Sequence, residues 1–518
     1  MTRTLSNPPA DWPGRIAAPP YDAANAHWAA NVNPRNWPLP AMRDRYHLVV
    51  IGGGTAGLVS AAIAVGLGAR VALVERAMLG GDCLNVGCVP SKALLRAARG
   101  WHDARSAAAE FGGPSVSGDG DFSAAMARLR ALRSQLSDVD SVTRFSELGV
   151  DVFLGDAAFV GPNVVRIGDR TVQFRRAIVA TGARAAVPPI PGLADTPFDT
   201  NETIFSVTER PTHLVVIGGG AIGAELAQAF ARLGTTVTLL NADERLLARE
   251  DADAAALVST ALHTNGVTQH HGVRVSSVAY SGGSFTVTAT AAQGSVTVQG
   301  DRLLVATGRA PNVDDLGLEA AGIAYSPKGI VVNDRLRTSN RRVFAIGDVS
   351  SRLQFTHVAD AQARLAVANA LFFGLGGGRN SSLIAPRVTY TSPELAQVGL
   401  TGAEAAAAGT KIDTITVPLT LVDRAVLDGA DTGFLKVHLR AGTDRILGGT
   451  LVADHAGEMI GELAVAITNR LGLGALGHTI HPYPTQAEVY RRAADAWRRT
   501  RLTPIARRAF AGWFKLFR

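Results

Sequence analysis

Residues 47–75, HLVVIGGGTAGLVSAAIAVGLGARVALVE, decide the fold class. An apolar strand leads into a glycine-rich turn and an apolar helix, and a second apolar strand ends at Glu75. The turn has the spacing G-x-G-x-x-G at Gly52, Gly54 and Gly57. Glycine there permits a tight turn and lets the backbone approach a pyrophosphate at the helix N-terminus. The stretch predicts a dinucleotide-binding βαβ unit in which Glu75 accepts from the hydroxyls of an adenosine ribose.

A second unit of the same kind follows, with HLVVIGG, AIGAELAQAFARLG and TVTLL in the same order. Its glycines are Gly218, Gly220 and Gly223. Asn241 stands 23 residues after Gly218, where the first unit has Glu75. A carboxylate there would repel the 2′-phosphate of NADPH, whereas Asn241 tolerates it, and Arg245 and Arg249 follow closely enough to reach it. We expect a nicotinamide nucleotide site that favours NADPH, with NADH as the alternative.

The window GGDCLNVGCVPSK at residues 80–92 contains both cysteines of the chain, Cys83 and Cys88. A C-x4-C step that closes onto a helix start lets one thiolate face a flavin while the other faces solvent, and a helix N-terminus lowers a cysteine pKa. A structural zinc site needs about four ligands, and no second Cys or His cluster supplies them. We therefore predict a redox-active pair and no metal site.

The composition describes a globular protein of several domains, with 518 residues, 47% hydrophobic and 18% charged. The net charge of +7 comes from residues 491–518, which hold nine Lys and Arg and one acid, so a nucleic-acid-binding body is not expected. Two cysteines in one window exclude a secreted disulfide framework, and the start lacks a signal-peptide pattern. We expect a cytoplasmic protein.

The last residues, 503–518, have the pattern of a basic amphipathic helix. Thr503 is a suitable N-cap and Pro504 a suitable first residue. Apolar and basic side chains then fall on opposite faces. We expect this helix to pack on its own subunit or on the amino-terminal arm, with binding to an anionic membrane as the alternative.

Taken together, the motifs resemble those of the class I pyridine nucleotide-disulfide oxidoreductases, which include dihydrolipoamide dehydrogenase, glutathione reductase and mercuric reductase. The resemblance covers about residues 46–500. Further matches follow in the family's order: ATGA at 180–183, TGRAPN at 307–312, VFAIGDV at 343–349 and YTSPELAQVGL at 390–400. It implies an α/β fold with two Rossmann-like domains, for FAD and NAD(P), an α+β C-terminal dimerisation domain, and a homodimer.

The same patterns suggest six segments along the chain. They are a Pro- and Trp-rich arm without helical or strand periodicity, expected to be extended (1–45), a first part of the FAD-binding domain (46–190), an NAD(P)-binding domain (191–310), a second FAD or central part (311–385), an interface domain (386–500) and the basic tail (501–518).

The resemblance also implies roles for individual residues. Cys88 would be the flavin-facing charge-transfer thiolate and Cys83 the interchange thiol that meets the substrate. Lys92 and Glu225 would form an ion pair beside the flavin ring, where the positive end stabilises charge on the reduced ring. The remaining implied contacts are Asp348 with the FAD ribityl chain, Thr181 and Gly182 near the FAD adenine or pyrophosphate, and Gly308 in the NAD(P) site.

One departure from the family lies in HPYPTQAE at residues 481–488. Disulfide-reducing members have a catalytic histidine before Pro-Thr, paired with a glutamate, and here the aligned residues are Tyr483 and Glu488. Tyrosine, with a reference pKa near 10, is a poor base at neutral pH. His481 could replace it only if the local register shifts. A tyrosine here resembles mercuric reductases, although the C-terminal cysteine pair of those enzymes is missing, so Hg(II) would have to reach Cys83 and Cys88 directly.

We therefore predict an FAD-dependent NAD(P)H oxidoreductase that passes electrons from nicotinamide through FAD to the Cys83/Cys88 disulfide and on to an acceptor, in the manner of mercuric reductase. Reduction of a disulfide, as by dihydrolipoamide dehydrogenase, and reduction of a quinone are the enzymatic alternatives. A cysteine-based redox sensor that signals through partner contacts is the alternative of another class.

Overall fold

The computed structural model describes residues 8–292, 294–372, 375 and 377–517. The chain divides into two compact units. The first unit consists of Met1–Ala104, Ser117–Ala242 and Thr268–Leu383. The second consists of Arg105–Val116, Asp243–Val267 and Ile384–Arg518. Among the described residues, no helix is long and apolar enough to cross a membrane.

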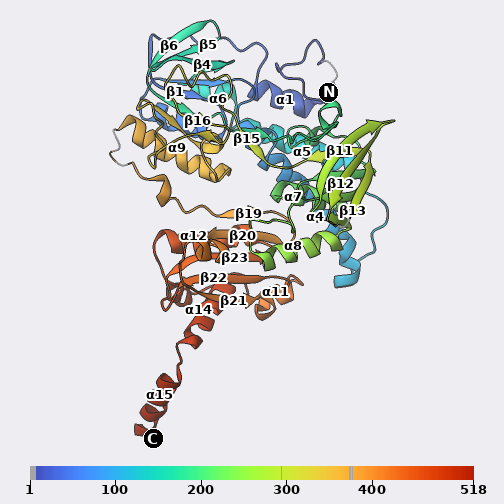
Figure 1. The fold of residues 1–518 in the computed structure, drawn as a ribbon, viewed down its shortest axis with the longest axis vertical. Coiled ribbons are helices and arrows are strands. Elements are labelled where there is room, and N and C mark those ends of the chain that lie inside the picture. The colour runs from blue at the N-terminus through green and yellow to red at the C-terminus, as the bar shows by residue number, and fades with distance from the viewer. Residues whose placement is uncertain (1–7, 293, 373–374, 376, 518) are drawn as a thin grey trace. The chain divides into compact units, whose positions relative to one another are not determined.

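The first unit contains a seven-stranded sheet in the order β3-β2-β1-β6-β5-β4, with β18 paired to β6 (Figure 1). Its strands are β1 (Arg45–Ile51), β2 (Val71–Glu75), β3 (Asp151–Leu154), β4 (Ala157–Gly161), β5 (Val164–Ile167), β6 (Arg170–Val179) and β18 (Val343–Ala345). β1, β2, β3, β6 and β18 are parallel, whereas β4 and β5 form an antiparallel extension. Helices α2 (Thr55–Gly66) and α9 (Thr356–Leu371) share a buried apolar cluster with these strands.

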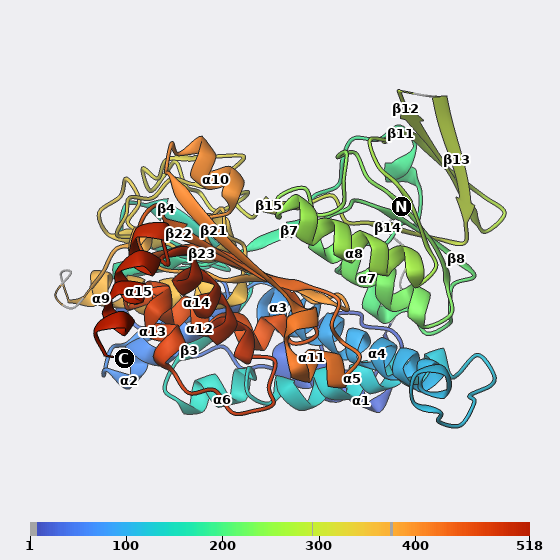
Figure 2. The same cartoon turned by 90° about the horizontal axis from the view of Figure 1, so that it is seen from below.

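A second sheet of the first unit has the order β10-β9-β8-β14, with β9, β8 and β14 parallel. Its strands are β8 (His213–Ile217), β9 (Thr236–Leu240), β10 (Val267–His270) and β14 (Arg302–Val305), and helix α7 (Ala221–Arg232) connects β8 to β9 (Figure 2). A meander of β11 (Arg274–Ser281), β12 (Ser284–Ala291) and β13 (Gly294–Gly300) is inserted before β14. The two predicted Rossmann-like units are thus present, and the α/β fold class is confirmed.

The prediction that the amino-terminal arm is extended throughout is wrong, because the arm contains a helix. Helix α1 (Ala23–Val32) begins after Asp22, whose side chain accepts from the backbone N–H of Asn25. The arm buries Trp12 and Trp28 in a small apolar cluster. The sequence of α1 is rich in alanine and asparagine and has no clear apolar periodicity. The helix is held in place by the few large side chains that it buries.

The second unit is built on a five-stranded antiparallel sheet in the order β19-β20-β23-β22-β21. Its elements are β19 (Arg387–Thr389), β20 (Glu394–Gly399), β21 (Ile412–Pro418), β22 (Phe434–Arg440), β23 (Ile446–Ala453), α12 (Ala456–Thr468), α13 (Leu473–His478) and α14 (Glu488–Thr500). A single apolar core joins this sheet to α12, α13 and α14. This is the α+β C-terminal domain that the sequence predicts.

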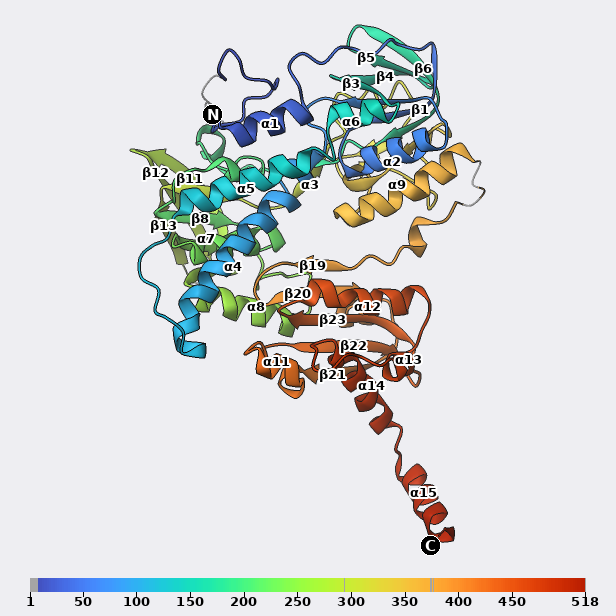
Figure 3. The ribbon, with the colours of Figure 1, turned by 180° about the vertical axis from the view of Figure 1, so that it is seen from behind.

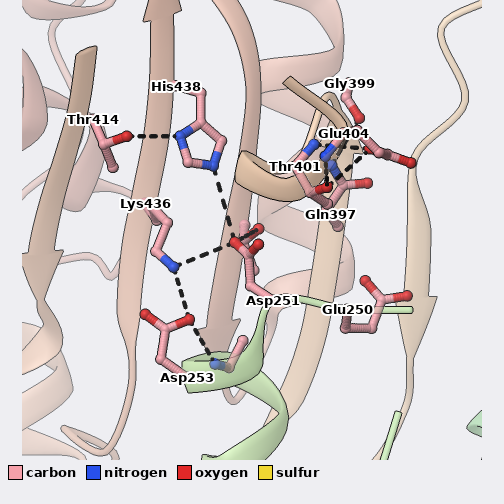
Figure 4. A network of polar contacts seen from close by, with 12 residues as sticks. Glu250, Asp251, Asp253, Gln397, Gly399, Thr401, Glu404, Thr414, Lys436 and His438 are labelled. Carbon is pink, nitrogen blue, oxygen red and sulfur yellow. Dashed lines mark hydrogen bonds and ion pairs between the residues drawn. The ribbon is translucent and has the colours of Figure 1, made fainter. Parts of the chain in front are cut away.

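Helix α8 (Ala252–Thr264), which also belongs to the second unit, is fastened to this sheet by charged groups (Figure 4). Lys436 on β22 donates to Asp251 at 3.3 Å and to Asp253 at 2.7 Å. Glu250 pairs with Arg387 at 2.8 Å. The residues that follow the second nucleotide-binding unit in sequence are therefore anchored on the C-terminal sheet.

The predicted helix of the tail is confirmed as α15 (Pro504–Leu516), with Thr503 as its N-cap. The expected packing of this helix on its own subunit is wrong, because no residue of α15 is buried. In Figures 1 and 3 the helix extends away from the sheet of the second unit. Within this chain its apolar face is therefore exposed.

Candidate functional site

The first glycine-rich turn is shaped to receive a pyrophosphate. A Cβ on Gly57 would lie 1.8 Å from the carbonyl oxygen of Gly52, so only glycine lets α2 start so close to β1. Gly54 is the N-cap of α2, and no side chain caps this helix. The N–H groups of its first turn therefore remain available to a phosphate, which the positive end of the helix dipole also favours. These residues fit the diphosphate of FAD.

Glu75 lies beneath this turn and is 8% exposed. Its Oε2 accepts from the backbone N–H of Gly53 at 2.6 Å, and its Oε1 accepts from the N–H groups of Ala77 and Met78 at 2.6 and 3.2 Å. Burial raises the pKa of Glu75, and these hydrogen bonds oppose the rise. The carboxylate is thus held at the end of β2, where the sequence predicts the ribose contact.

The ATGA and TGRAPN motifs meet through Asn312. Thr181 Oγ1 donates to the Asn312 carbonyl at 2.7 Å, and the Asn312 side chain donates to the Thr181 carbonyl at 2.9 Å. The N–H of Asn312 donates to the Gly182 carbonyl at 3.0 Å. Ala186 donates in the same way to the Gly308 carbonyl at 2.9 Å. Thr181, Gly182 and Gly308 therefore lie at one crossover between the two sheets of the first unit.

Cys83 and Cys88 lie close together, on α3 (Gly81–Asn85) and at the first residue of α4 (Cys88–Phe111). A hydrogen bond from the Cys83 thiol lowers the pKa of Cys88 to about 6. A hydrogen bond from Thr356 and the charge of Lys92 act in the same direction, against burial. The pKa of Cys83 is raised by its hydrogen bond to Cys88 and by burial. The arrangement favours one thiolate, Cys88, beside one thiol.

The ion pair between Lys92 and Glu225 links α4 to α7. Lys92 Nζ donates to Glu225 Oε2 at 2.8 Å. The Glu225 side chain is 6% exposed and that of Lys92 is 37% exposed. The pair therefore connects the helix of the cysteine window to the first helix of the second nucleotide-binding unit, and it places a cation near Cys88.

Asp348 was predicted as a site residue, but the charged side chains beside it, Arg309 and Asp82, were not. It lies on the short helix η3 (Gly347–Val349), with its carboxylate 3.7 Å from Arg309 Nε. Arg309 also pairs with Asp82, the residue before Cys83. Burial raises the pKa of Asp348 to about 6, and the positive charge of Arg309 opposes this rise. The only signal for Arg309 was its place in the TGRAPN motif.

The second glycine-rich turn repeats the geometry of the first. Gly220 is the N-cap of α7, again without a side-chain cap, and Gly218 and Gly223 flank it in the turn. Asn241, which is 3% exposed, accepts from the Gly219 N–H through Oδ1 at 3.2 Å. Its amide nitrogen lies 3.3 Å from Nδ1 of His271. These residues fit a nicotinamide nucleotide, with His271 as an additional neighbour of the ribose position.

Arg245, one of the two arginines predicted to reach a 2′-phosphate, makes hydrogen bonds within its own segment. Its guanidinium donates to the carbonyls of Leu247, Ala248 and Glu250 at 3.1, 2.7 and 2.7 Å. These bonds close the turn that leads into α8, so the side chain already has a structural role. The contact of Arg245 or Arg249 with a 2′-phosphate stays a prediction.

The motif HPYPTQAE lies in the second unit. The Tyr483 hydroxyl, on a side chain 70% exposed, donates to Asp423 at 2.9 Å, which raises the pKa of Tyr483. Glu488 is 4% exposed, accepts from Arg491 and forms an ion pair with Arg492, both on its own helix. His481 Nε2 lies 2.9 Å from Glu462, and only 6% of its side chain is exposed. His481 is therefore held inside this unit, while Tyr483 faces solvent.

Comparisons with known proteins agree with this geometry. Residues 46–363 match the pyridine nucleotide-disulphide oxidoreductase model and residues 385–494 match the dimerisation domain of the same enzymes, which supports a homodimer. The chain is 38% identical to a mercuric reductase from Acidithiobacillus ferrooxidans, covering 90% of this chain and 86% of that protein. It is 31% identical to a dihydrolipoyl dehydrogenase from Bacillus subtilis, covering 88% and 98%.

A solved structure gives a similar match. The HOCl-induced flavoprotein disulfide reductase RclA from Escherichia coli, in complex with Cu(II), superimposes with a TM-score of 0.77 at 30% identity. The match covers 88% of this chain and 99% of that one. The amino-terminal arm lies outside both regions that the family models match.

Proposed function

Because the chain belongs to the pyridine nucleotide-disulphide oxidoreductase family, whose members are FAD- and NAD(P)-dependent oxidoreductases, we propose that it passes electrons from NAD(P)H through FAD to Cys83 and Cys88 and then to Hg(II). The observation that carries the proposal is the unequal pair of thiols. The hydrogen bond from Cys83, helped by Thr356 and Lys92, lowers the pKa of Cys88, and the pKa of Cys83 is raised, so Cys88 is the thiolate of the pair.

Different residues have the proposed roles of binding FAD, binding the nicotinamide nucleotide and stabilising charge at the flavin. Bound FAD supplies the two-electron link between the nicotinamide and the cysteine pair. The first turn of α2 binds its pyrophosphate, Glu75 its adenosine ribose, and Asp348 its ribityl chain. Lys92, held by Glu225, stabilises negative charge beside the flavin ring. The turn at the start of α7 binds the nicotinamide nucleotide.

Hg(II) is favoured as the acceptor for two reasons. Thiolates are soft ligands and suit soft metal ions, and Cys83 and Cys88 can present two sulfur atoms to one ion. Tyr483 also replaces the histidine expected of a disulfide reductase. In the proposed reaction NAD(P)H is oxidised to NAD(P)⁺ with release of one proton, and Hg(II) takes up two electrons to become Hg(0). With no third cysteine in the chain, the ion must reach this pair directly.

For the nicotinamide nucleotide we propose a preference for NADPH over NADH. Asn241 carries no charge that would repel a 2′-phosphate, and its hydrogen bond to Gly219 holds it at the end of β9. Steady-state turnover with each nucleotide tests this preference. A lower KM for NADPH supports it, and a lower KM for NADH contradicts it.

An acceptor panel tests the main proposal. Purified enzyme is supplied with NADPH and, in separate reactions, with Hg(II), lipoamide, glutathione disulfide and a quinone. We expect the fastest NADPH oxidation with Hg(II), and its loss in Cys83→Ser and Cys88→Ser. Faster turnover with a disulfide or a quinone would contradict Hg(II) as the acceptor and identify that compound class instead. Reduction of the protein without turnover on any acceptor would favour the redox sensor.

We also propose that α15 binds the surface of an anionic membrane. On the helix, Ile505, Phe510, Trp513, Phe514 and Leu516 share one side and are between 54% and 79% exposed. Arg508 and Lys515 lie on the opposite side, Arg507 lies at its edge, and no acid follows Asp495 in the chain. Aromatic side chains suit the lipid headgroup boundary, and the basic face suits anionic lipid. Two such helices in a homodimer would bind more tightly than one.

Sedimentation with vesicles tests this second proposal. The full chain should pellet with phosphatidylglycerol vesicles and not with phosphatidylcholine vesicles. The double variant Trp513→Ser, Phe514→Ser should lose this binding, whereas Phe111→Ser, which removes an equally exposed aromatic side chain elsewhere, should keep it. Unchanged binding of the double variant, or a change in its oligomeric state, would assign the helix to another contact, such as a second copy of the chain.

A further inference from the structure

The amino-terminal arm makes buried contacts with the loop that carries the cysteines. Trp12, Trp28 and Val32 of the arm form one apolar cluster with Leu84, the residue after Cys83. The carbonyl of Val32 also accepts from the N–H of Leu79, just before this loop. The arm lies outside the residues that the family model matches, whereas Leu79 and Leu84 lie within them.

Trp28 makes a specific polar contact in this cluster. Its Nε1 donates to Oδ1 of Asn85 at 2.7 Å, and both side chains are buried. The side-chain nitrogen of Asn85 donates in turn to the carbonyls of Leu79 and Gly81 at 2.9 and 2.7 Å. Asn85 lies between Cys83 and Cys88 in the chain, so its amide fastens the segment between the two cysteines to the residues that precede Cys83.

Arg133 on α5 (Phe122–Ser137) completes the contact from the other side. It is 3% exposed, and its guanidinium lies 3.9 Å from the centre of the Trp28 ring. It donates to the Asn85 carbonyl at 3.0 Å and to the Asn25 side chain on α1 at 2.7 Å. Figure 3 shows α1 beside α5, which the contacts between these helices confirm. A buried cation thus joins the arm to the redox loop.

From these contacts we propose that Trp28 is a positioning residue for the cysteine pair, and that the arm acts as a strap on the loop 83–88. The inference rests on the redox role proposed for Cys83 and Cys88. A loop held in one conformation keeps the two sulfur atoms close, so closing the disulfide costs little entropy. A loosened loop lets the two thiols occupy more arrangements, and the disulfide becomes easier to reduce.

The thiol-disulfide equilibrium of Trp28→Phe tests the proposal. Phenylalanine keeps an aromatic ring in the cluster but removes the donor to Asn85. The purified, FAD-loaded protein is equilibrated at constant pH with mixtures of reduced and oxidised dithiothreitol, and its thiols are trapped and counted. We expect the equilibrium of Trp28→Phe to move about tenfold toward the dithiol, which corresponds to about 30 mV for a two-electron couple.

Trp12→Phe is a matched control on the same arm. Trp12 is also 3% exposed and lies in the same cluster, but its Nε1 donates to the carbonyl of Ile16, within the arm. Both variants should lower the melting temperature, and only Trp28→Phe should shift the thiol equilibrium. Equal shifts in both variants, or a shift in neither, would overturn the proposal. If the wild-type cysteines do not cycle at all, the redox function itself fails.

Discussion

Replacing Thr356 with valine should raise the pKa of Cys88 by about one unit. Thr356 Oγ1 lies 3.3 Å from Cys88 Sγ, and this hydrogen bond is one of the groups that lower the Cys88 pKa to about 6. A hydrogen bond to a charged group contributes roughly 1.5–3 kcal/mol, and sulfur is a weak acceptor, so we take about 1.4 kcal/mol, or one pKa unit. Valine keeps the shape of threonine and removes only the hydroxyl.

The assay is a pH titration of the long-wavelength charge-transfer absorbance after anaerobic reduction with one equivalent of NADPH. This absorbance requires the Cys88 thiolate, so in the wild type it should be lost as the pH falls through about 6. In Thr356→Val the midpoint should lie near pH 7. At pH 6 the thiolate fraction should then fall from about one half to about one tenth.

A control variant distinguishes the loss of the Thr356 hydroxyl from a change in local packing. Thr356→Ser keeps a hydroxyl at the start of α9 and should titrate like the wild type. If the midpoint of Thr356→Val stays at the wild-type value while FAD remains bound, Thr356 does not stabilise the thiolate. An equal shift in Thr356→Ser would show that packing, not the hydrogen bond, sets the pKa.

Three further predictions follow from the site. Lys92→Met should lower the free energy of unfolding by about 2 kcal/mol, because it removes an ion-pair partner of the buried Glu225. The expected loss is smaller than for a fully buried ion pair, since Lys92 is 37% exposed. Unfolding in urea measures it. Asn241→Asp should raise the KM for NADPH about tenfold, because the new carboxylate repels the 2′-phosphate, and should leave the KM for NADH almost unchanged. Equal changes in both KM values would contradict a contact between residue 241 and the ribose. Tyr483→His should increase lipoamide turnover at least about tenfold by supplying a base of suitable pKa, and no gain would show that the missing histidine is not what limits this reaction.

Local spacing was enough to predict the main elements of the fold. Gly52, Gly57 and Glu75 lie within one strand-turn-helix-strand stretch, so their geometry follows from neighbours in the chain. The helix α15 was likewise predicted from Thr503 and Pro504. Its packing was not, because an apolar face in the sequence does not say what covers it, and in the structure this face is exposed.

Of the contacts between distant segments, the Lys92–Glu225 ion pair was predicted through the family resemblance, whereas others had no signal in the sequence. Asp82, Arg309 and Asp348 meet in space, although each lies in a different motif. Trp28 and Asn85 are joined in the same way by a contact that no local pattern encodes. Helix α1 was missed because its alanines and asparagines show no apolar stripe, although Asp22 gave a usable N-cap signal.

The central claim is that electrons from the nicotinamide reach Cys83 and Cys88. Because the chain contains no other cysteine, counting thiols after anaerobic addition of one equivalent of NADPH to the oxidised protein tests it directly. We predict that two thiols per subunit appear together with the charge-transfer absorbance, and that Cys88→Ser keeps FAD but loses this absorbance. A flavin that is reduced while the thiol count stays unchanged would contradict the account.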